Sequence, residues 1–186
     1  MTSLKTNKLL LLLLLIMPAA VHGTGWQSLD SLESRLVPSD PLMIFDGIST
    51  VSLYSSLLLP LPDIIRSEDS LSDAGTYTAA LGVSYGIKEY LKQISGRIRP
   101  DGEIHSFPSG HAAGSGTALG FLVYMNRHRE EASPGYLYAA VSLQGITAVG
   151  RVLSGSHYPT DVLAGFLIGA AAGYLVPAAA DLLFGR

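Results

Sequence analysis

Residues 107–125 read FPSGHAAGSGTALGFLVYM, and this stretch decides which fold the chain can adopt. Ser109 is one of the residue types that cap helix N-termini, and residues 112–125 carry no charge. The stretch lacks the sustained period-two alternation of a β-strand, and its many small residues suit close helix packing. It therefore predicts a buried helix over residues 109–126.

Four more uncharged stretches surround this helix, and the charged residues gather between them. They cover residues 47–62, 74–87, 132–150 and 162–180. Strand signals are weak throughout the chain. We therefore expect an all-α fold, a bundle of about five to six helices with its functional residues at one end.

The helical bundle could be embedded in a membrane or be soluble in water. Several uncharged stretches reach 18 or 19 residues, close to the ~20 that a membrane-spanning helix needs. Charged residues make up 15% of the chain, against a typical ~25%. These features favour a membrane-embedded bundle, and a soluble bundle with a small-residue core is the alternative.

The N-terminus has the pattern of a targeting segment. Lys5 and Lys8 precede the apolar run Leu9–Met17, and small residues follow up to Gly23. This pattern predicts a signal peptide over residues 1–23, cleaved for instance after Gly23, or an uncleaved N-terminal anchor. We expect residues 24–44 to form a polar linker with a short surface helix, and residues 45–186 to form one helical domain.

The composition excludes several classes of function. The chain has no cysteine, so disulfides, thiolate zinc sites and a thiol nucleophile are ruled out. The net charge is −3 and no basic stripe is present, so nucleic acid is not an expected partner.

The start of the 109–126 helix suits a phosphate group. Helix N-termini present free backbone N–H groups and a partial positive charge, and Gly110 lets the backbone approach a ligand closely. His111, in the first turn, is expected to point to the same place. The alternative is a capped helix with a surface histidine.

A second segment, Arg151-x5-His157-x3-Asp161, combines a cation, an imidazole and a carboxylate. A carboxylate bonded to one imidazole nitrogen fixes the tautomer and leaves the other nitrogen free to attack. The planar fork of Arg151 can hold two phosphate oxygens. The alternative is a surface loop with a salt bridge.

A third segment, Lys92-x6-Arg99-Pro100, supplies two more cations. If the N-terminus is inside and each stretch crosses a membrane once, all three segments fall outside and Arg127–Arg129 falls inside. We expect the other cations near helix ends (Lys88, Arg97 and Arg186) to be helix-dipole partners or interfacial anchors. We expect the remaining histidines (His22, His105 and His128) to be bystanders.

Taken together, the three segments resemble the type-2 phosphatidic acid phosphatase superfamily, whose helical core is shared with vanadium-dependent haloperoxidases. The family signature is K-x6-R-P, then P-S-G-H, then S-R-x5-H-x3-D. The resemblance covers residues 45–180 approximately, and Gly150 stands where the third motif commonly has serine. It implies a helical phosphatase with the signature residues at its active site.

The resemblance also implies a mechanism. His157 would attack phosphorus and form a phosphohistidine, Asp161 would orient it, and His111 would protonate the leaving oxygen and then activate water. The remaining signature positions would bind the phosphate oxygens (Lys92, Arg99, Ser109, Gly110 and Arg151). No metal or other cofactor is implied, and vanadate is expected to inhibit as a transition-state mimic.

The leading hypothesis is a phosphatase acting on a lipid or isoprenoid phosphate at the outer face of a bacterial inner membrane. A soluble exported acid phosphatase for small phosphomonoesters is the alternative. A vanadate-dependent haloperoxidase and a non-catalytic lipid-binding relative are two further hypotheses. The sequence does not identify the lipid or the oligomeric state.

Overall fold

The computed structural model describes residues 26–185, and every regular element in that range is helical. The elements are α2 (Trp26–Glu33), a 3-10 turn η1 (Ser34–Leu36), α3 (Ile44–Leu58), α4 (Leu61–Arg66), α5 (Ser70–Ser95), α6 (Gly110–His128), α7 (Pro134–Leu153) and α8 (Pro159–Phe184). The expected all-α bundle is therefore confirmed.

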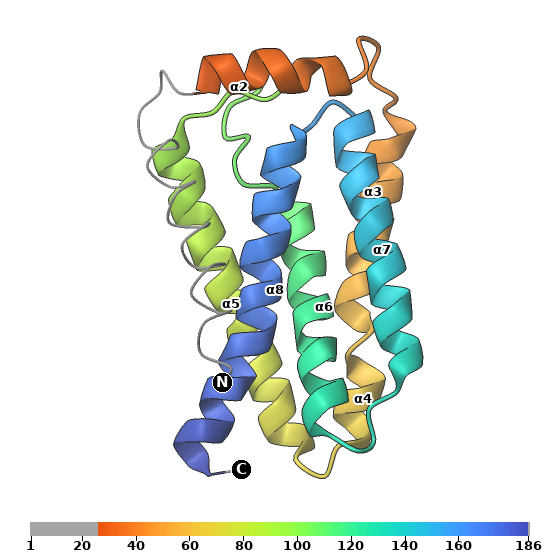
Figure 1. The fold of residues 1–186 in the computed structure, drawn as a ribbon. Helices are drawn as coiled ribbons and strands as arrows, with labels where there is room; N and C mark the ends of the chain where they lie inside the picture. The colour runs from red at the N-terminus through yellow and green to blue at the C-terminus, as the bar shows by residue number, and fades with distance from the viewer. Residues whose placement is uncertain (1–25, 186) are drawn as a thin grey trace, which may run out of the picture.

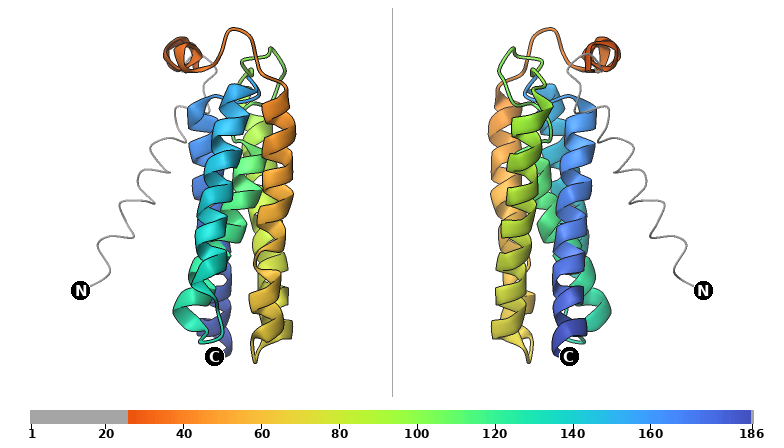
Figure 2. Two further views of the ribbon diagram at one scale, coloured as in Figure 1. Left: turned by 90° about the vertical axis from the view of Figure 1, so that its right-hand side faces the viewer. Right: turned by 90° about the vertical axis from the view of Figure 1, so that its left-hand side faces the viewer.

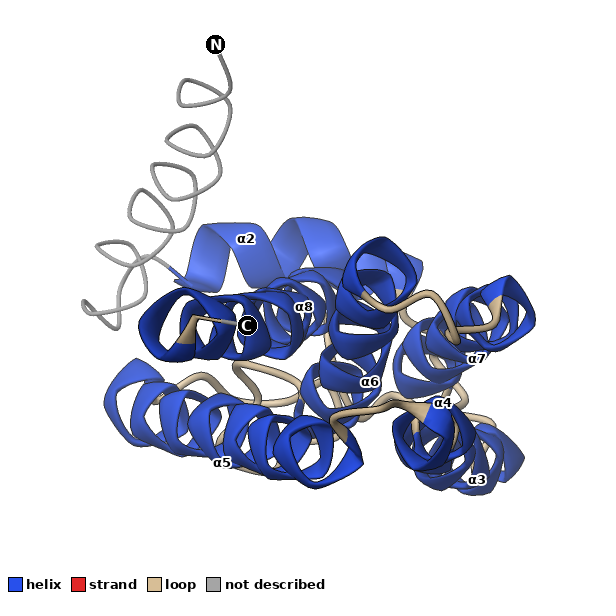
Figure 3. Ribbon diagram, turned by 90° about the horizontal axis from the view of Figure 1, so that it is seen from below, coloured by secondary structure: helices blue, strands red, loops and turns tan. Residues whose placement is uncertain are grey.

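Helix α6 occupies the centre of the bundle. It packs against α8 and α5 on one side and against α3 and α7 on the other. Seen along the helices, α6 lies between these two pairs (Figure 3). The long helices run up and down side by side, and α2 lies across one end of them (Figures 1 and 2).

The contact between α6 and α8 depends on glycine. A Cβ atom at Gly169 would overlap the backbone oxygen of Ala113, and one at Gly120 would overlap that of Ala170. The two helix backbones therefore approach more closely than side chains would allow, as is common where helices associate in membranes.

The helix boundaries follow local signals. Ser109 is the N-cap of α6, as expected, and its Oγ accepts a hydrogen bond from the N–H of Ala112 at 3.5 Å. Helix α5 ends at Gly96, which has a φ of +55°, a conformation that glycine adopts at low cost. The expected 47–62 stretch divides into α3 and α4, which meet at Pro60.

A partly buried ion cluster lies at the end of the bundle opposite α2. The Arg129 guanidinium donates to both carboxylate oxygens of Asp73, at 3.0 and 3.1 Å, and to Asp181 at 3.3 Å. These residues come from the α6–α7 connection, α5 and α8. The cluster therefore fixes the ends of α5 and α8 against the centre of the bundle.

The outer surface suits a lipid environment. The segments Ile44–Arg66 and Pro159–Phe184 are long and apolar enough to span a membrane. Large apolar side chains are exposed around the bundle, with exposed fractions of 67% for Val51, 54% for Val141 and 52% for Leu175. A soluble protein rarely exposes apolar side chains in such number.

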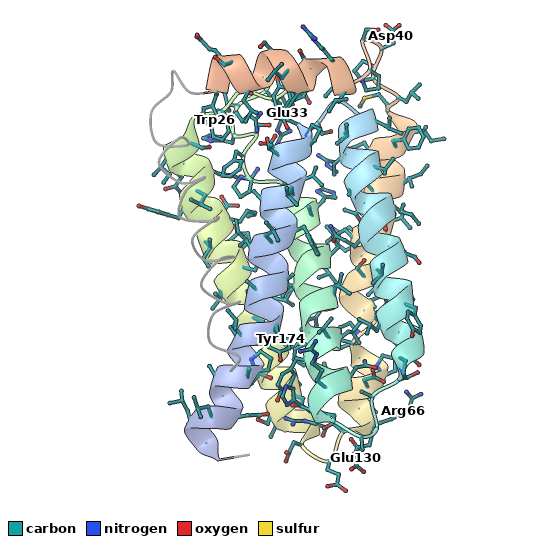
Figure 4. The ribbon with its side chains drawn as sticks, viewed as in Figure 1. Trp26, Glu33, Asp40, Arg66, Glu130 and Tyr174 are labelled. Atoms are coloured by element: carbon teal, nitrogen blue, oxygen red, sulfur yellow. The ribbon has the colours of Figure 1, made fainter. Side chains whose placement is uncertain are left out.

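The segment 24–44 contains a short helix, as expected, and residues 26–44 lie within the described range. This helix, α2, is docked rather than simply laid on the surface, since Trp26 and Glu33 are both buried. Their side chains lie on the underside of α2, toward the bundle (Figure 4). The predicted signal peptide lies outside the described residues, and the predicted domain limits stay a prediction.

Candidate active site

The three signature segments meet at the α2 end of the bundle. Lys92 lies near the end of α5, His111 in the first turn of α6 and Arg151 near the end of α7. His157 lies in the connection before α8, and Asp161 lies in the first turn of α8. The fold therefore brings together residues that are up to 69 positions apart in the sequence.

His157 and Asp161 are neighbours through a turn, because α8 begins at Pro159. Nδ1 of His157 lies 3.6 Å from Oδ2 of Asp161, which is within ion-pair range and slightly beyond a hydrogen bond. Nδ1 has no other partner among the described residues. Since Nδ1 faces the carboxylate, Nε2 is the ring nitrogen left for a substrate.

His157 is almost fully buried, with 2% of its side chain exposed. Burial lowers the pKa of His157 below its ordinary value, although the carboxylate of Asp161 acts in the opposite direction. A lowered pKa keeps the imidazole neutral, and the neutral form is the one that can attack an electrophile.

Asp161 is fully buried and accepts hydrogen bonds from three directions. Its partners are the Ser106 hydroxyl at 2.5 Å, the Tyr158 N–H at 2.9 Å and the Arg97 guanidinium at 2.6 Å. A carboxylate held by this many donors has little freedom to rotate, so its position relative to His157 is fixed.

Arg97 is the largest departure from the sequence expectation. It was expected to be a helix-dipole partner or an interfacial anchor, and it is instead completely buried. Besides Asp161, its guanidinium donates to Asp30 at 2.7 Å and to Glu33 at 2.5 Å, both on α2. Its Cζ lies 4.4 Å from the ring centre of Trp26 and 4.3 Å from that of Tyr158.

This cluster joins three carboxylates to one guanidinium. Burial alone would lower the pKa of Arg97, but the carboxylates of Asp161, Glu33 and Asp30 outweigh it and raise that pKa. Glu33 also accepts from the N–H and the hydroxyl of Thr160 at the start of α8, at 2.8 and 2.7 Å. Helix α2 is thereby bonded to the same turn that carries Asp161.

His111 is held by a residue of α3. Its Nε2 lies 3.0 Å from the Thr50 hydroxyl oxygen. Thr50 was not singled out in the sequence, because a threonine 61 positions away gives no local signal of this contact.

Some polar groups at the start of α6 already form hydrogen bonds within the protein. The Ser109 N–H donates to the backbone oxygen of Asp161 at 2.9 Å, and Ser109 Oγ serves as the N-cap. Of the signature groups at this helix start, the Ser109 hydroxyl and the Gly110 N–H can still donate to a ligand. A Cβ atom on Gly110 would lie 3.3 Å from Lys88 Cδ. Lys88, which was expected to be a helix-dipole partner or an interfacial anchor, therefore lies beside the start of α6.

Each of the three signature cations has a partner within the protein. Lys92 Nζ donates to the His105 backbone oxygen at 3.0 Å, and Arg99 pairs with Glu103 at 2.7 Å. Arg151 pairs with Asp46 of α3.

Two donors at these cations are unsatisfied. The Nε groups of Arg99 and Arg151 are buried and have no hydrogen-bond partner among the described residues. An unsatisfied buried donor costs about 1–3 kcal/mol, which an anionic ligand would recover by accepting its hydrogen bond. The structure therefore brings every signature residue to one end of the bundle and leaves donors there suited to an oxyanion.

The residues missed in the sequence act through tertiary contacts (Asp30, Glu33, Asp46, Thr50, Lys88, Arg97 and Ser106). The one sequence signal for Arg97 was the acidic pair Asp30 and Glu33. Their spacing puts them on one face of a short helix, where they need a cation.

Comparison with known proteins agrees with this site. The sequence profile of the PAP2 superfamily matches residues 73–183, which is more than half of the chain. The chain therefore belongs to the PAP2 superfamily, and the resemblance seen in its motifs is confirmed.

Two curated relatives are similar to this chain. Phosphatidylglycerophosphatase B of Bacillus subtilis is 29% identical over 189 residues, covering 90% of this chain and 91% of the relative. Lipid A 1-phosphatase of Porphyromonas gingivalis is 33% identical over 108 residues, covering 56% of this chain. The aligned part is only 24% of that longer relative. The family to which the chain belongs is therefore one of lipid phosphatases, which are phosphoric monoester hydrolases.

A solved structure shares the fold. The crystal structure of a transmembrane PAP2-type phosphatidylglycerolphosphate phosphatase from Bacillus subtilis matches with a TM-score of 0.72 and 23% identity. The match covers 96% of this chain and 97% of the other. This likeness shows a shared fold, and two segments of the chain, Ile44–Arg66 and Pro159–Phe184, are long and apolar enough to span a membrane.

Proposed function

We propose that this protein is a metal-independent phosphatase that hydrolyses a lipid or isoprenoid phosphate through a phosphohistidine on His157. The observation that carries the proposal is the position of His157. It is buried, aligned by Asp161 and located at the same end of the bundle as two arginines whose Nε donors are unsatisfied.

In the proposed first half-reaction His157 is the nucleophile and His111 is the acid. Nε2 of His157 attacks phosphorus, an N–P bond forms and the bond from phosphorus to the leaving oxygen breaks. His111, oriented by Thr50, donates its proton to that oxygen. Asp161 stabilises the positive charge that develops on the ring of His157.

In the second half-reaction His111 accepts a proton from water, and the water oxygen attacks the phosphohistidine. The N–P bond breaks and inorganic phosphate leaves. Five groups neutralise the phosphoryl oxygens in both transition states (Lys92, Arg99, Arg151, the Ser109 hydroxyl and the Gly110 N–H). In this scheme fixed side-chain cations supply the positive charge, so no metal is required, and vanadate is expected to inhibit.

Arg97 has a positioning role in this proposal. It is not one of the five groups assigned to the phosphate. It donates to Oδ1 of Asp161, whereas His157 faces Oδ2, and it links that carboxylate to α2.

The most direct support for a lipid substrate is the relative that aligns over almost its full length, a phosphatidylglycerophosphatase. We propose a phospholipid phosphomonoester such as phosphatidylglycerol phosphate as the first substrate to test. The site lies at the end opposite Arg127 and Arg129, which supports an active site on the outer face of the bacterial inner membrane.

The function is tested with purified protein in detergent and a panel of lipid and soluble phosphates. We expect phosphate release from lipid substrates, and loss of release in both His157→Ala and His111→Ala. His128→Ala is the matched control, because His128 lies on α6 like His111 but in its last turn, at the other end of the bundle. A phosphoenzyme that is labile to acid and stable to alkali should form during turnover of the unaltered protein and be absent from His157→Ala. Full activity in His157→Ala would falsify the nucleophile assignment.

A further inference from the structure

Lys88 lies outside the signature, and its side chain has little contact with water. It is on α5, one helical turn before Lys92, and 14% of its side chain is exposed. A lysine near a helix end usually extends its ammonium group to water. The side chain of Lys88 instead folds toward the start of α6, where a Cβ atom on Gly110 would lie 3.8 Å from Nζ. A positive charge that the signature does not include is therefore held next to the proposed active site.

The ammonium group of Lys88 lies beside the start of α6 and not in front of it. The free N–H groups of a helix N-terminus point along the helix axis, whereas a Cβ atom points outward from the helix. Lys88 approaches the Cβ position of Gly110, so it comes from the side. The scissile phosphate is assigned to the N–H groups. Lys88 is therefore placed to meet a second group, next to that phosphate.

A pocket of about 240 Å³ begins at this point, and residues of α3, α5 and α6 line it. Lys88 carries the one charged side chain among the described residues of its lining. The part farther from the site is apolar, with Leu81 of α5 and Leu53 and Leu57 of α3. Such a lining suits a ligand that has an anionic group at one end and an apolar part beyond it.

We propose that Lys88 binds a second anionic group of the substrate, namely a phosphodiester that a three-carbon glycerol linker separates from the scissile phosphate. This inference rests on the proposed function, because the scissile phosphate defines where the second group lies. Lys88 and Lys92 are four residues apart on one face of α5, a rise of ~6 Å. A three-carbon linker matches that spacing better than the single bridging oxygen of a diphosphate. The acyl chains then continue along the apolar part of the pocket.

The two partners that Lys88 has in the structure are compatible with an added anion. The ring centre of Tyr85 lies 4.1 Å from Nζ, a contact that holds the ammonium group from one side. Glu89 pairs with Lys88, but its side chain is 38% exposed, so it can turn to water when an anion binds. An ammonium group has three donors, so a diester oxygen can accept one hydrogen bond while the contact with Tyr85 stays.

The test compares two lipids with the same acyl chains, phosphatidylglycerol phosphate and phosphatidic acid, in mixed detergent micelles. Both carry a phosphomonoester, and the first also carries a phosphodiester. We expect Lys88→Met to lower kcat/KM by roughly ten- to a hundredfold for phosphatidylglycerol phosphate and by less than about threefold for phosphatidic acid, because a charge-assisted hydrogen bond is lost with the first lipid alone. Lys88→Arg keeps the charge and should retain most of the preference of the unaltered protein.

Arg127→Met is the matched control, because it removes one positive charge at the other end of α6. It should change neither value. All activities are normalised to the folded fraction from thermal melts, and Lys88→Gln is used if Lys88→Met does not fold. An equal loss for both lipids would place Lys88 at the scissile phosphate, and no loss for either lipid would make it a structural residue. Either result overturns the proposal.

A binding measurement separates this inference from the proposed function. Each lipid is titrated into His157→Ala protein with and without Lys88→Met, and the rise in melting temperature reports binding without turnover. If the unaltered protein releases no phosphate, the proposed function fails. Weaker binding of phosphatidylglycerol phosphate alone in the Lys88→Met protein still supports the second anion site. An active enzyme in which Lys88→Met leaves both binding curves unchanged keeps the function and overturns the site.

Discussion

Arg97 is a completely buried arginine that pairs with three carboxylates. It connects Asp161, which orients the proposed nucleophile, to Asp30 and Glu33 on α2. Breaking a buried ion cluster by removing one partner typically costs about 3–5 kcal/mol, because charge is left without compensation. A residue of this kind can affect turnover without touching the substrate.

We predict that Arg97→Met lowers kcat strongly and changes KM little, because substrate contacts stay and only the alignment of Asp161 is lost. Stability should fall by about 3–5 kcal/mol as three carboxylates lose their cation. Arg97→Lys should recover part of both, since it keeps the charge but not the fork that reaches three partners. Steady-state kinetics, normalised to the folded fraction from thermal melts, measures both effects.

Arg35→Lys serves as the control for these variants, because Arg35 is an exposed arginine next to the same helix. A kcat for Arg97→Met that equals that of the unaltered protein, once normalised for folding, would limit Arg97 to a purely structural role.

The ionisation of His157 gives a second prediction at this scale. The imidazole must be neutral to attack, so activity is lost as pH falls through its pKa. Burial places that pKa below the ordinary 6.5, and the Asp161 carboxylate raises it. Asp161→Asn should therefore lower kcat and also move the acid limb of kcat/KM to lower pH, by roughly one to three units, the usual effect of a lost opposite charge.

The pH profile is measured with the same substrate for both proteins, so that ionisation of the substrate cancels in the difference. Asp40→Asn, at an exposed position outside the site, should leave the profile unchanged. An acid limb that moves to higher pH in Asp161→Asn would contradict the assigned electrostatics.

The signature residues were predictable from the sequence because their chemical types stand at fixed spacings along the chain. Their partners were not. Thr50 lies 61 positions from His111, and Asp46 lies 105 positions from Arg151. Contacts at such separations depend on which helices become neighbours. Arg97 was misinterpreted for the same reason, because only the docking of α2 gives it its carboxylates.

At the scale of the elements, the uncharged stretches predicted the positions of the long helices, but the observed helices begin and end at other residues. Helix α5 begins at Ser70, inside a charged stretch, because Asp73 is neutralised by Arg129 from across the bundle. A sequence window sees the charge of Asp73 but not its distant partner. The sequence likewise showed that these helices are rich in glycine, but not that α6 and α8 pack directly against each other.

We predict that Gly169→Ala destabilises the protein by about 1–3 kcal/mol, because the added methyl group overlaps the Ala113 backbone oxygen and forces α6 and α8 apart. Gly82→Ala on α5 is the matched control, since a Cβ atom there meets nothing within 4 Å. That control should be neutral or stabilising by up to about 1 kcal/mol, the helix propensity gain of alanine over glycine. Unfolding in detergent, followed by circular dichroism, compares the two. Equal stability of both variants would show that the helix pair is not closely packed.

At the scale of the whole molecule, the fold separates two charged ends by an apolar surface. The α2 end carries the proposed active site, and the opposite end carries the cluster of Arg129, Asp73 and Asp181. The apolar side chains exposed between them match a bilayer, and Arg127 and Arg129 at the second end predict that this end faces the inside of the cell. The sequence alone indicated this polarity through its loop charges, but it could not separate a membrane bundle from a soluble one.

We predict that the α2 end faces the outside of the cell. Asp101→Cys, in an exposed loop at that end, should react with a membrane-impermeant maleimide in intact spheroplasts. Glu130→Cys, exposed at the other end of the bundle (Figure 4), should react only after the membrane is permeabilised. Both single-cysteine proteins start from a chain without cysteine, so any labelling reports the introduced thiol. Both positions are exposed but lie at opposite ends of the bundle. A difference in their labelling therefore reports the membrane that the maleimide cannot cross. The reverse pattern would place the site inside the cell, and equal labelling of both in intact spheroplasts would mean that the bundle does not span the membrane.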